Sequence, residues 1–100
     1  MRELNRIILH CTATPEGRDV SVDDIRRWHV DGNGWSDIGY HYVILLDGTI
    51  ARGRPIDVAG AHVKGHNKDS VGVVYVGGTD VDGQPKDTLT HNQLFALYKV

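Results

Sequence analysis

The sequence is poor in cysteine and has no long apolar run. Cys11 is the only cysteine among 100 residues, so the chain has no partner for an intrachain disulfide. A membrane-spanning helix needs about 20 apolar residues in a row, and none is present, so we expect no membrane insertion. The apolar run at residues 7–9 is too short for the core of a signal peptide. As written, the sequence predicts a protein that stays in the cytoplasm unless another route carries it out.

An excess of charge of either sign is also missing. The formal net charge is −2, from 11 basic and 13 acidic residues. Electrostatic binding to nucleic acid needs a clustered basic face, so we expect no nucleic-acid partner. What is present is ordinary: 40% hydrophobic and 24% charged residues, which is typical of a globular domain. The length allows one small domain; the oligomeric state is not specified.

Alternation of apolar residues predicts the strands of one mixed sheet. We expect strands at residues 6–12, 40–46 and 71–76, with a fourth at 49–52 that follows a hairpin turn at Asp47-Gly48. The first strand is apolar on both faces, which favours a central position. His10 lies near its carboxyl end, where open α/β sheets tend to build their sites.

Capping residues predict two helices. One begins at Ser21, carries Ile25 with Trp28 or His29 on its apolar side, and ends within residues 31–34. The second begins with a capping box at Thr90–Gln93. It reaches residue 100 without a C-cap, a pattern typical of a domain whose last helix and strand are incomplete. The sequence therefore predicts an α/β fold with helices packed on the faces of a single mixed β-sheet.

A long loop lies between the last two strands. Residues 54–68 contain His62, Lys64, His66 and Asn67 together with two glycines. Loops of this length in a compact domain are often functional, although most loop histidines are simply solvated.

Ordered blocks along nearly the whole chain resemble one family, the type-2 N-acetylmuramoyl-L-alanine amidases, which include bacteriophage T7 lysozyme-like enzymes and peptidoglycan recognition proteins. The blocks are residues 8–14, 25–29, 34–44, 47–49, 53–54, 60–62, 65–67, 70–73 and 76–78. The most specific reads Gly34-Trp35-Ser36-Asp37-Ile38-Gly39-Tyr40-His41-Tyr42. The resemblance implies that residues 1–100 form an amidase-like catalytic domain that lacks its C-terminal segment.

The resemblance also implies a zinc site and a substrate. Family members typically hold one zinc ion with two histidines and a cysteine or aspartate. His10 matches the first ligand, Tyr40 the tyrosine that assists catalysis, and His62 a histidine that lines the substrate groove. Lys64, His66 and Asn67 are candidate contacts for peptidoglycan or a muropeptide. The remaining ligands and a catalytic lysine are expected beyond Val100, so this chain alone is expected to be inactive.

The implied reaction is hydrolysis of the amide between N-acetylmuramic acid and L-alanine. Zinc suits it because the ion acidifies water and polarises a carbonyl. Residue by residue, plainer interpretations stay open: His10 as a core histidine, Tyr40 as a packed strand aromatic, and His41 as a structural group. Trp28 and Trp35 are expected to be core or loop anchors. At the level of the protein, the alternatives are a non-catalytic peptidoglycan-binding module and a regulatory protein.

Overall fold

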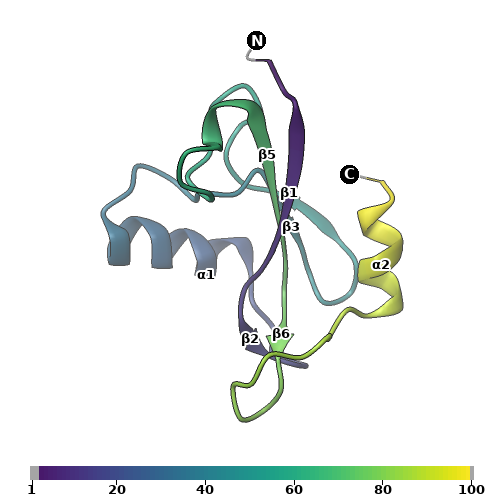
Figure 1. Cartoon of the computed structure of the whole chain (residues 1–100). Helices are drawn as coiled ribbons and strands as arrows, with labels where there is room; N and C mark the ends of the chain where they lie inside the picture. The colour runs from purple at the N-terminus through teal and green to yellow at the C-terminus, as the bar shows by residue number, and fades with distance from the viewer. Residues whose placement is uncertain (1–2, 100) are drawn as a thin grey trace.

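A four-stranded mixed sheet organises the chain. The computed structural model describes residues 3–99. The strands are β1 (Arg6–Cys11), β3 (Tyr42–Ile44), β4 (Ile50–Arg52) and β5 (Ser70–Tyr75), in the order β1-β5-β3-β4. β5 runs parallel to β1 and β3, and β3 forms an antiparallel hairpin with β4. Helices lie on opposite sides of this sheet (Figure 1). The predicted fold class is confirmed.

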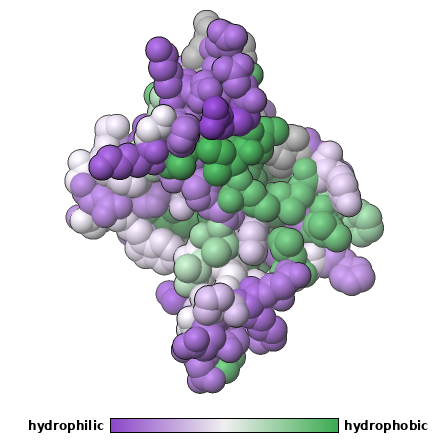
Figure 2. All heavy atoms as spheres, in the orientation of Figure 1, coloured by the Kyte–Doolittle hydropathy of each residue, from purple (hydrophilic) through white to green (hydrophobic). Residues whose placement is uncertain are grey.

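The central position predicted for the first strand is wrong. Among the described residues β1 lies at the edge of the sheet, and β5 lies between β1 and β3. Ile7 and Leu9 are 63% and 46% exposed, whereas Val73 on β5 is 1% exposed. Both strands are apolar on two faces, and this pattern alone does not say which strand has neighbours on both edges. Hydrophobic residues are visible over β1 and toward α2 in Figure 2.

Helix α1 (Val22–Arg27) begins as the capping residues predict. The Ser21 side chain accepts from the Asp24 N–H, and the Asp24 carboxylate accepts from the Ser21 N–H. The helix continues into a π-helical turn, η1 (Trp28–Gly32). Ile25 is buried, and His29 rather than Trp28 lies on the inner side; Trp28 is exposed, against the expectation of an anchor.

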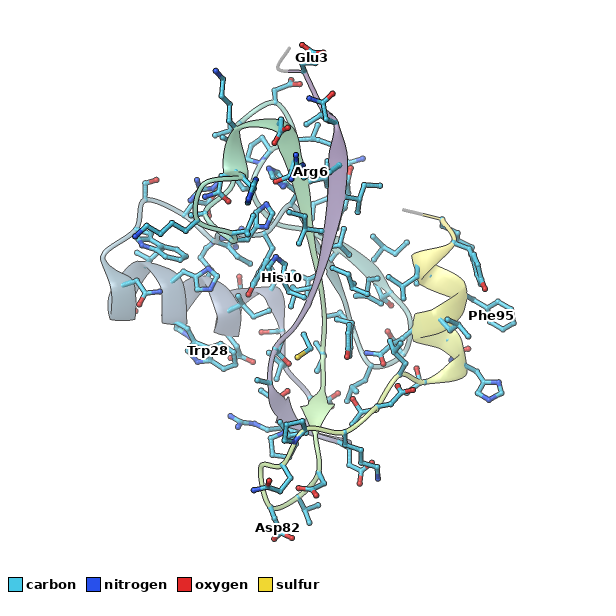
Figure 3. The ribbon with its side chains drawn as sticks, viewed as in Figure 1. Glu3, Arg6, His10, Trp28, Asp82 and Phe95 are labelled. Atoms are coloured by element: carbon cyan, nitrogen blue, oxygen red, sulfur yellow. The ribbon has the colours of Figure 1, made fainter. Side chains whose placement is uncertain are left out.

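Helix α2 (His91–Leu97) has the predicted capping box between Thr90 and Gln93. It packs on the opposite face of the sheet, where Ala96 joins a core cluster with Ile44, Val71 and Val73. Its outer side carries exposed Leu94, Phe95 and Tyr98. Figure 3 shows Phe95 pointing away from the body of the molecule.

Two short strands were not predicted. β2 (Thr14–Pro15) and β6 (Gly78–Thr79) pair in parallel and extend the β1–β5 ladder after a break. The break coincides with positive φ angles at Ala13, Gly77 and Gly78, and glycine adopts such angles without a steric penalty. Two-residue strands have no hydrophobic period that a sequence could reveal. In the described part of the chain, no helix is long and apolar enough to cross a membrane.

Candidate active site

His10 projects from β1 toward the α1 side of the sheet (Figure 3). Its parallel partner on β5 is Val74, a member of the core cluster that also contains Ile25. The next residue, Cys11, pairs with Tyr75, which packs against the cluster on the other face. Burial lowers the pKa of the His10 imidazole. A neutral ring at physiological pH keeps a lone pair for a proton or a metal.

Tyr40 lies just before β3 and contacts His10. The ring centroids are 5.3 Å apart and the planes are tilted by 52°. Burial raises the pKa of the Tyr40 phenol, and the neighbouring Cys11 adds to the rise. The hydroxyl therefore stays protonated at neutral pH, as a hydrogen-bond donor must.

His62 joins the same cluster from the long loop. Its Nδ1 lies 2.9 Å from Nε2 of His10, and its Nε2 lies 3.2 Å from the Ser70 hydroxyl. The ring sits directly on Gly72, because a Cβ added there would lie 2.5 Å from Cδ2 of His62. The structure thus brings together His10, Tyr40 and His62 from three separate segments.

His41 has the structural position that was expected. The side chain is buried, its Nδ1 accepts from the Gly72 N–H at 3.0 Å, and its Nε2 donates to the Val58 carbonyl at 2.8 Å. Its ring lies 5.9 Å from that of His62. It therefore supports the strand and loop beneath the cluster.

The other three loop residues have surroundings of their own. Lys64 and His66 are exposed, and the His66 Nδ1 accepts from Arg6 at 3.2 Å. The Asn67 side-chain oxygen accepts from the backbone N–H groups of His62 and Val63, both at 2.9 Å. Asn67 therefore orders the loop that carries His62, and its predicted contact with substrate stays a prediction.

Sequence reasoning missed His29 as a neighbour of the cluster. Its ring lies 5.4 Å from Tyr40 and 4.7 Å from Trp35, and its Nδ1 accepts from the Gly39 N–H at 2.8 Å. Burial and the charge of Arg54 lower the pKa of His29. A histidine within an amphipathic helix gives no signal of the loop that it will meet.

Arg54 was also missed. Its guanidinium donates to the carbonyls of Asp37, Ile38 and Ala59, at 3.2, 2.9 and 2.9 Å. Asp37 in turn accepts from Arg26 of α1 at 3.0 Å. These bonds tie the segment before Tyr40 to the start of the long loop and to α1, which fixes the direction from which Tyr40 approaches His10.

His10 is the candidate metal ligand of this cluster. Within residues 3–99, no three histidine, cysteine or acidic side chains gather as a metal site. His10 suits zinc because imidazole is one of its preferred ligands, but a catalytic zinc usually has three protein ligands. The described residues therefore fit part of a zinc site and do not complete one.

The chain that carries the cluster of His10, Tyr40 and His62 also matches a known family. The model of the N-acetylmuramoyl-L-alanine amidase family matches residues 1–100. The chain belongs to this amidase family. The endolysin of Enterobacteria phage K11 is 47% identical over 96 residues, which cover 96% of this chain and 63% of the endolysin.

Solved structures of amidase-fold proteins agree with this assignment. The amidase LysC from Clostridium intestinale superposes with a TM-score of 0.83 at 32% identity, over 98% of this chain and 60% of LysC. A structure of tracheal cytotoxin bound to the ectodomain complex of the peptidoglycan recognition proteins LCa and LCx gives a TM-score of 0.72 at 28% identity, over 98% of this chain and 61% of that one. This chain therefore spans about three fifths of the length of these amidase relatives.

Proposed function

We propose that the protein to which this chain belongs hydrolyses the amide bond between N-acetylmuramic acid and L-alanine in peptidoglycan, with zinc as cofactor. The observation that carries the proposal is the contact of His10 with both Tyr40 and His62 in a chain of the amidase family. The names of the endolysin and amidase relatives support the reaction class and the cell-wall substrate.

Each residue of the cluster has a role in this proposal. His10 would be one ligand of the zinc ion, which when bound supplies an acidified water and a polarised carbonyl. Tyr40 would donate its hydroxyl proton in a hydrogen bond to the oxyanion that develops on the scissile carbonyl. In the net reaction the water oxygen bonds to the lactyl carbon, the C–N bond breaks, and the amine of L-alanine takes up a proton.

His62 would hold His10 in place, and the exposed side of its loop, with Lys64 and His66, would face the muropeptide. The exposure of both side chains leaves them accessible to a large polymer. The enzyme would act on the cell wall after release or export. The 100-residue chain alone is expected to lack activity, because the described residues hold too few metal ligands.

Digestion of purified peptidoglycan tests the reaction. The longest protein encoded by the reading frame should release new amino-terminal L-alanine without new reducing sugar ends, and a chelator should stop the release. New reducing ends would instead indicate a glycosidase and would contradict the proposal.

A second candidate is peptidoglycan binding without cleavage. The bound tracheal cytotoxin in the structure of the LCa and LCx ectodomains favours it, because that fold holds a muropeptide there. Sedimentation of the same protein with insoluble peptidoglycan, without release of L-alanine, would support this candidate over the hydrolase.

A further inference from the structure

The hydrogen bonds around Ser70 fix where one proton must lie. Its hydroxyl donates to the His66 carbonyl at 2.7 Å, and a carbonyl oxygen only accepts. A hydroxyl has a single proton, so Ser70 has none left for His62. The contact of 3.2 Å between Nε2 of His62 and the Ser70 oxygen is therefore a bond in which His62 donates.

The same count of protons fixes the tautomers of His62 and then of His10. A neutral imidazole carries one N–H, and in His62 that N–H is at Nε2, which leaves Nδ1 as an acceptor. The His10 nitrogen 2.9 Å away is Nε2, so it must be the donor. The proton of His10 then lies on Nε2, and Nδ1 keeps its lone pair.

We propose that Ser70 and His62 act as positioning residues that hold His10 in its Nε2–H tautomer, so that Nδ1 is the nitrogen presented to a metal. The second half of this statement rests on the proposed function. The first half concerns the metal-free protein and stands without it. Partners of this kind fix both the tautomer and the ring orientation of ligating histidines.

The neighbouring groups hold the side chains of Ser70 and His62 in place. Ser70 is fully buried at the start of β5. The His62 ring packs directly on Gly72, where a Cβ would lie 2.5, 2.6 and 2.8 Å from three ring atoms. The Asn67 side-chain oxygen accepts from the backbone N–H groups of His62 and Val63. A preorganised site needs this kind of support.

The opposite arrangement, with a protonated His62, predicts a different tautomer of His10. A protonated His62 would donate from both nitrogens, so Nε2 of His10 would accept and the His10 proton would move to Nδ1. That tautomer would block Nδ1 as a ligand. The tautomer of His10 therefore decides between the two arrangements.

Long-range ¹H–¹⁵N NMR of the ¹⁵N-labelled chain, treated with a chelator and held well above the usual histidine pKa of about 6.5, reads this directly. We expect both His10 and His62 as Nε2–H tautomers. In Ser70→Ala, the His62 proton loses its acceptor, and we expect a mixture of tautomers at both histidines. The control Thr79→Val removes another buried hydroxyl, remote in sequence from His62, and should leave both tautomers unchanged.

An Nδ1–H tautomer of His10 in the unmodified chain would overturn the proposal, whatever the variants do. So would a folded Ser70→Ala whose His10 and His62 tautomers are unchanged. The NMR experiment contains neither metal nor peptidoglycan. A failed amidase assay therefore does not change the tautomer result, and an unexpected tautomer does not count against the proposed amidase reaction.

Discussion

Nε2 of His10 and Nδ1 of His62 lie 2.9 Å apart although the two residues are separated by 52 positions in the sequence. The first comes from a strand at the sheet edge and the second from a long loop. This one contact joins the candidate metal ligand to the loop that would meet the substrate.

The His62 ring packs directly on Gly72. We expect Gly72→Ala to push His62 out of its position, because the new methyl group would overlap the ring. The NMR signals of His62 and His10 should both shift, and peptidoglycan cleavage by the longer protein should fall. Gly32→Ala is a matched control, since a Cβ there meets nothing within 4 Å. Unchanged histidine signals in Gly72→Ala would contradict this role.

The Tyr40 hydroxyl is expected to matter for chemistry and little for folding. Tyr40→Phe should lower kcat by about 10²–10³, the usual cost of removing one donor to a developing oxyanion. Tyr42→Phe is the control, because Tyr42 packs on the α2 side of the sheet. Steady-state cleavage rates together with thermal melts of all three proteins check this. Equal rates for Tyr40→Phe and the unmodified protein would exclude the catalytic role.

The inside and the edge of the sheet predict different costs for the same substitution. Ile44 is fully buried beneath α2, so Ile44→Ala should lower the free energy of unfolding by about 2–5 kcal/mol. Ile7 on β1 is 63% exposed, so Ile7→Ala should cost under about 1 kcal/mol. Urea unfolding measures both. A large loss for Ile7→Ala would mean that another part of the protein, or a second copy, covers β1.

His29 predicts a pH dependence of stability. Its folded-state pKa is lowered by burial and by Arg54. Above the ordinary pKa of about 6.5 both states are neutral and His29 adds no dependence. As the pH falls through that value, the unfolded chain takes up a proton and the folded chain resists, so stability falls. His29→Asn keeps an acceptor for the Gly39 N–H but does not titrate.

Urea midpoints at pH 7.5 and pH 5.5 compare the two proteins. We expect the midpoint to drop less on acidification in His29→Asn than in the unmodified chain. An equal drop in both would show that His29 already carries its proton in the fold, or that it is not buried.

The sequence predicts the elements of this fold better than their neighbours. Alternation found β5 and the β3–β4 hairpin, and capping boxes at Ser21 and Thr90 found both helix starts, because these signals are local. The order of strands depends on packing between distant segments, so β1 was placed centrally although it lies at the edge.

The candidate site shows the same division. The family resemblance pointed to His10, Tyr40 and His62, and the structure brings these three together. Ser70, His29 and Arg54 were missed, because each acts through a backbone group or a ring that only the folded chain brings near. The predicted substrate contacts of Lys64, His66 and Asn67 stay predictions; in the structure Lys64 and His66 are exposed, and Asn67 bonds to the backbone of the loop.

Zinc binding through His10 is measured by the zinc content of the longest protein from this reading frame, after dialysis, with and without His10→Ala. His91→Ala is the control, because His91 is exposed at the start of α2. We expect about one zinc ion per chain in the unmodified protein and the control, and loss of zinc and of L-alanine release in His10→Ala. Full zinc content and cleavage in His10→Ala would contradict the role of His10 as a zinc ligand.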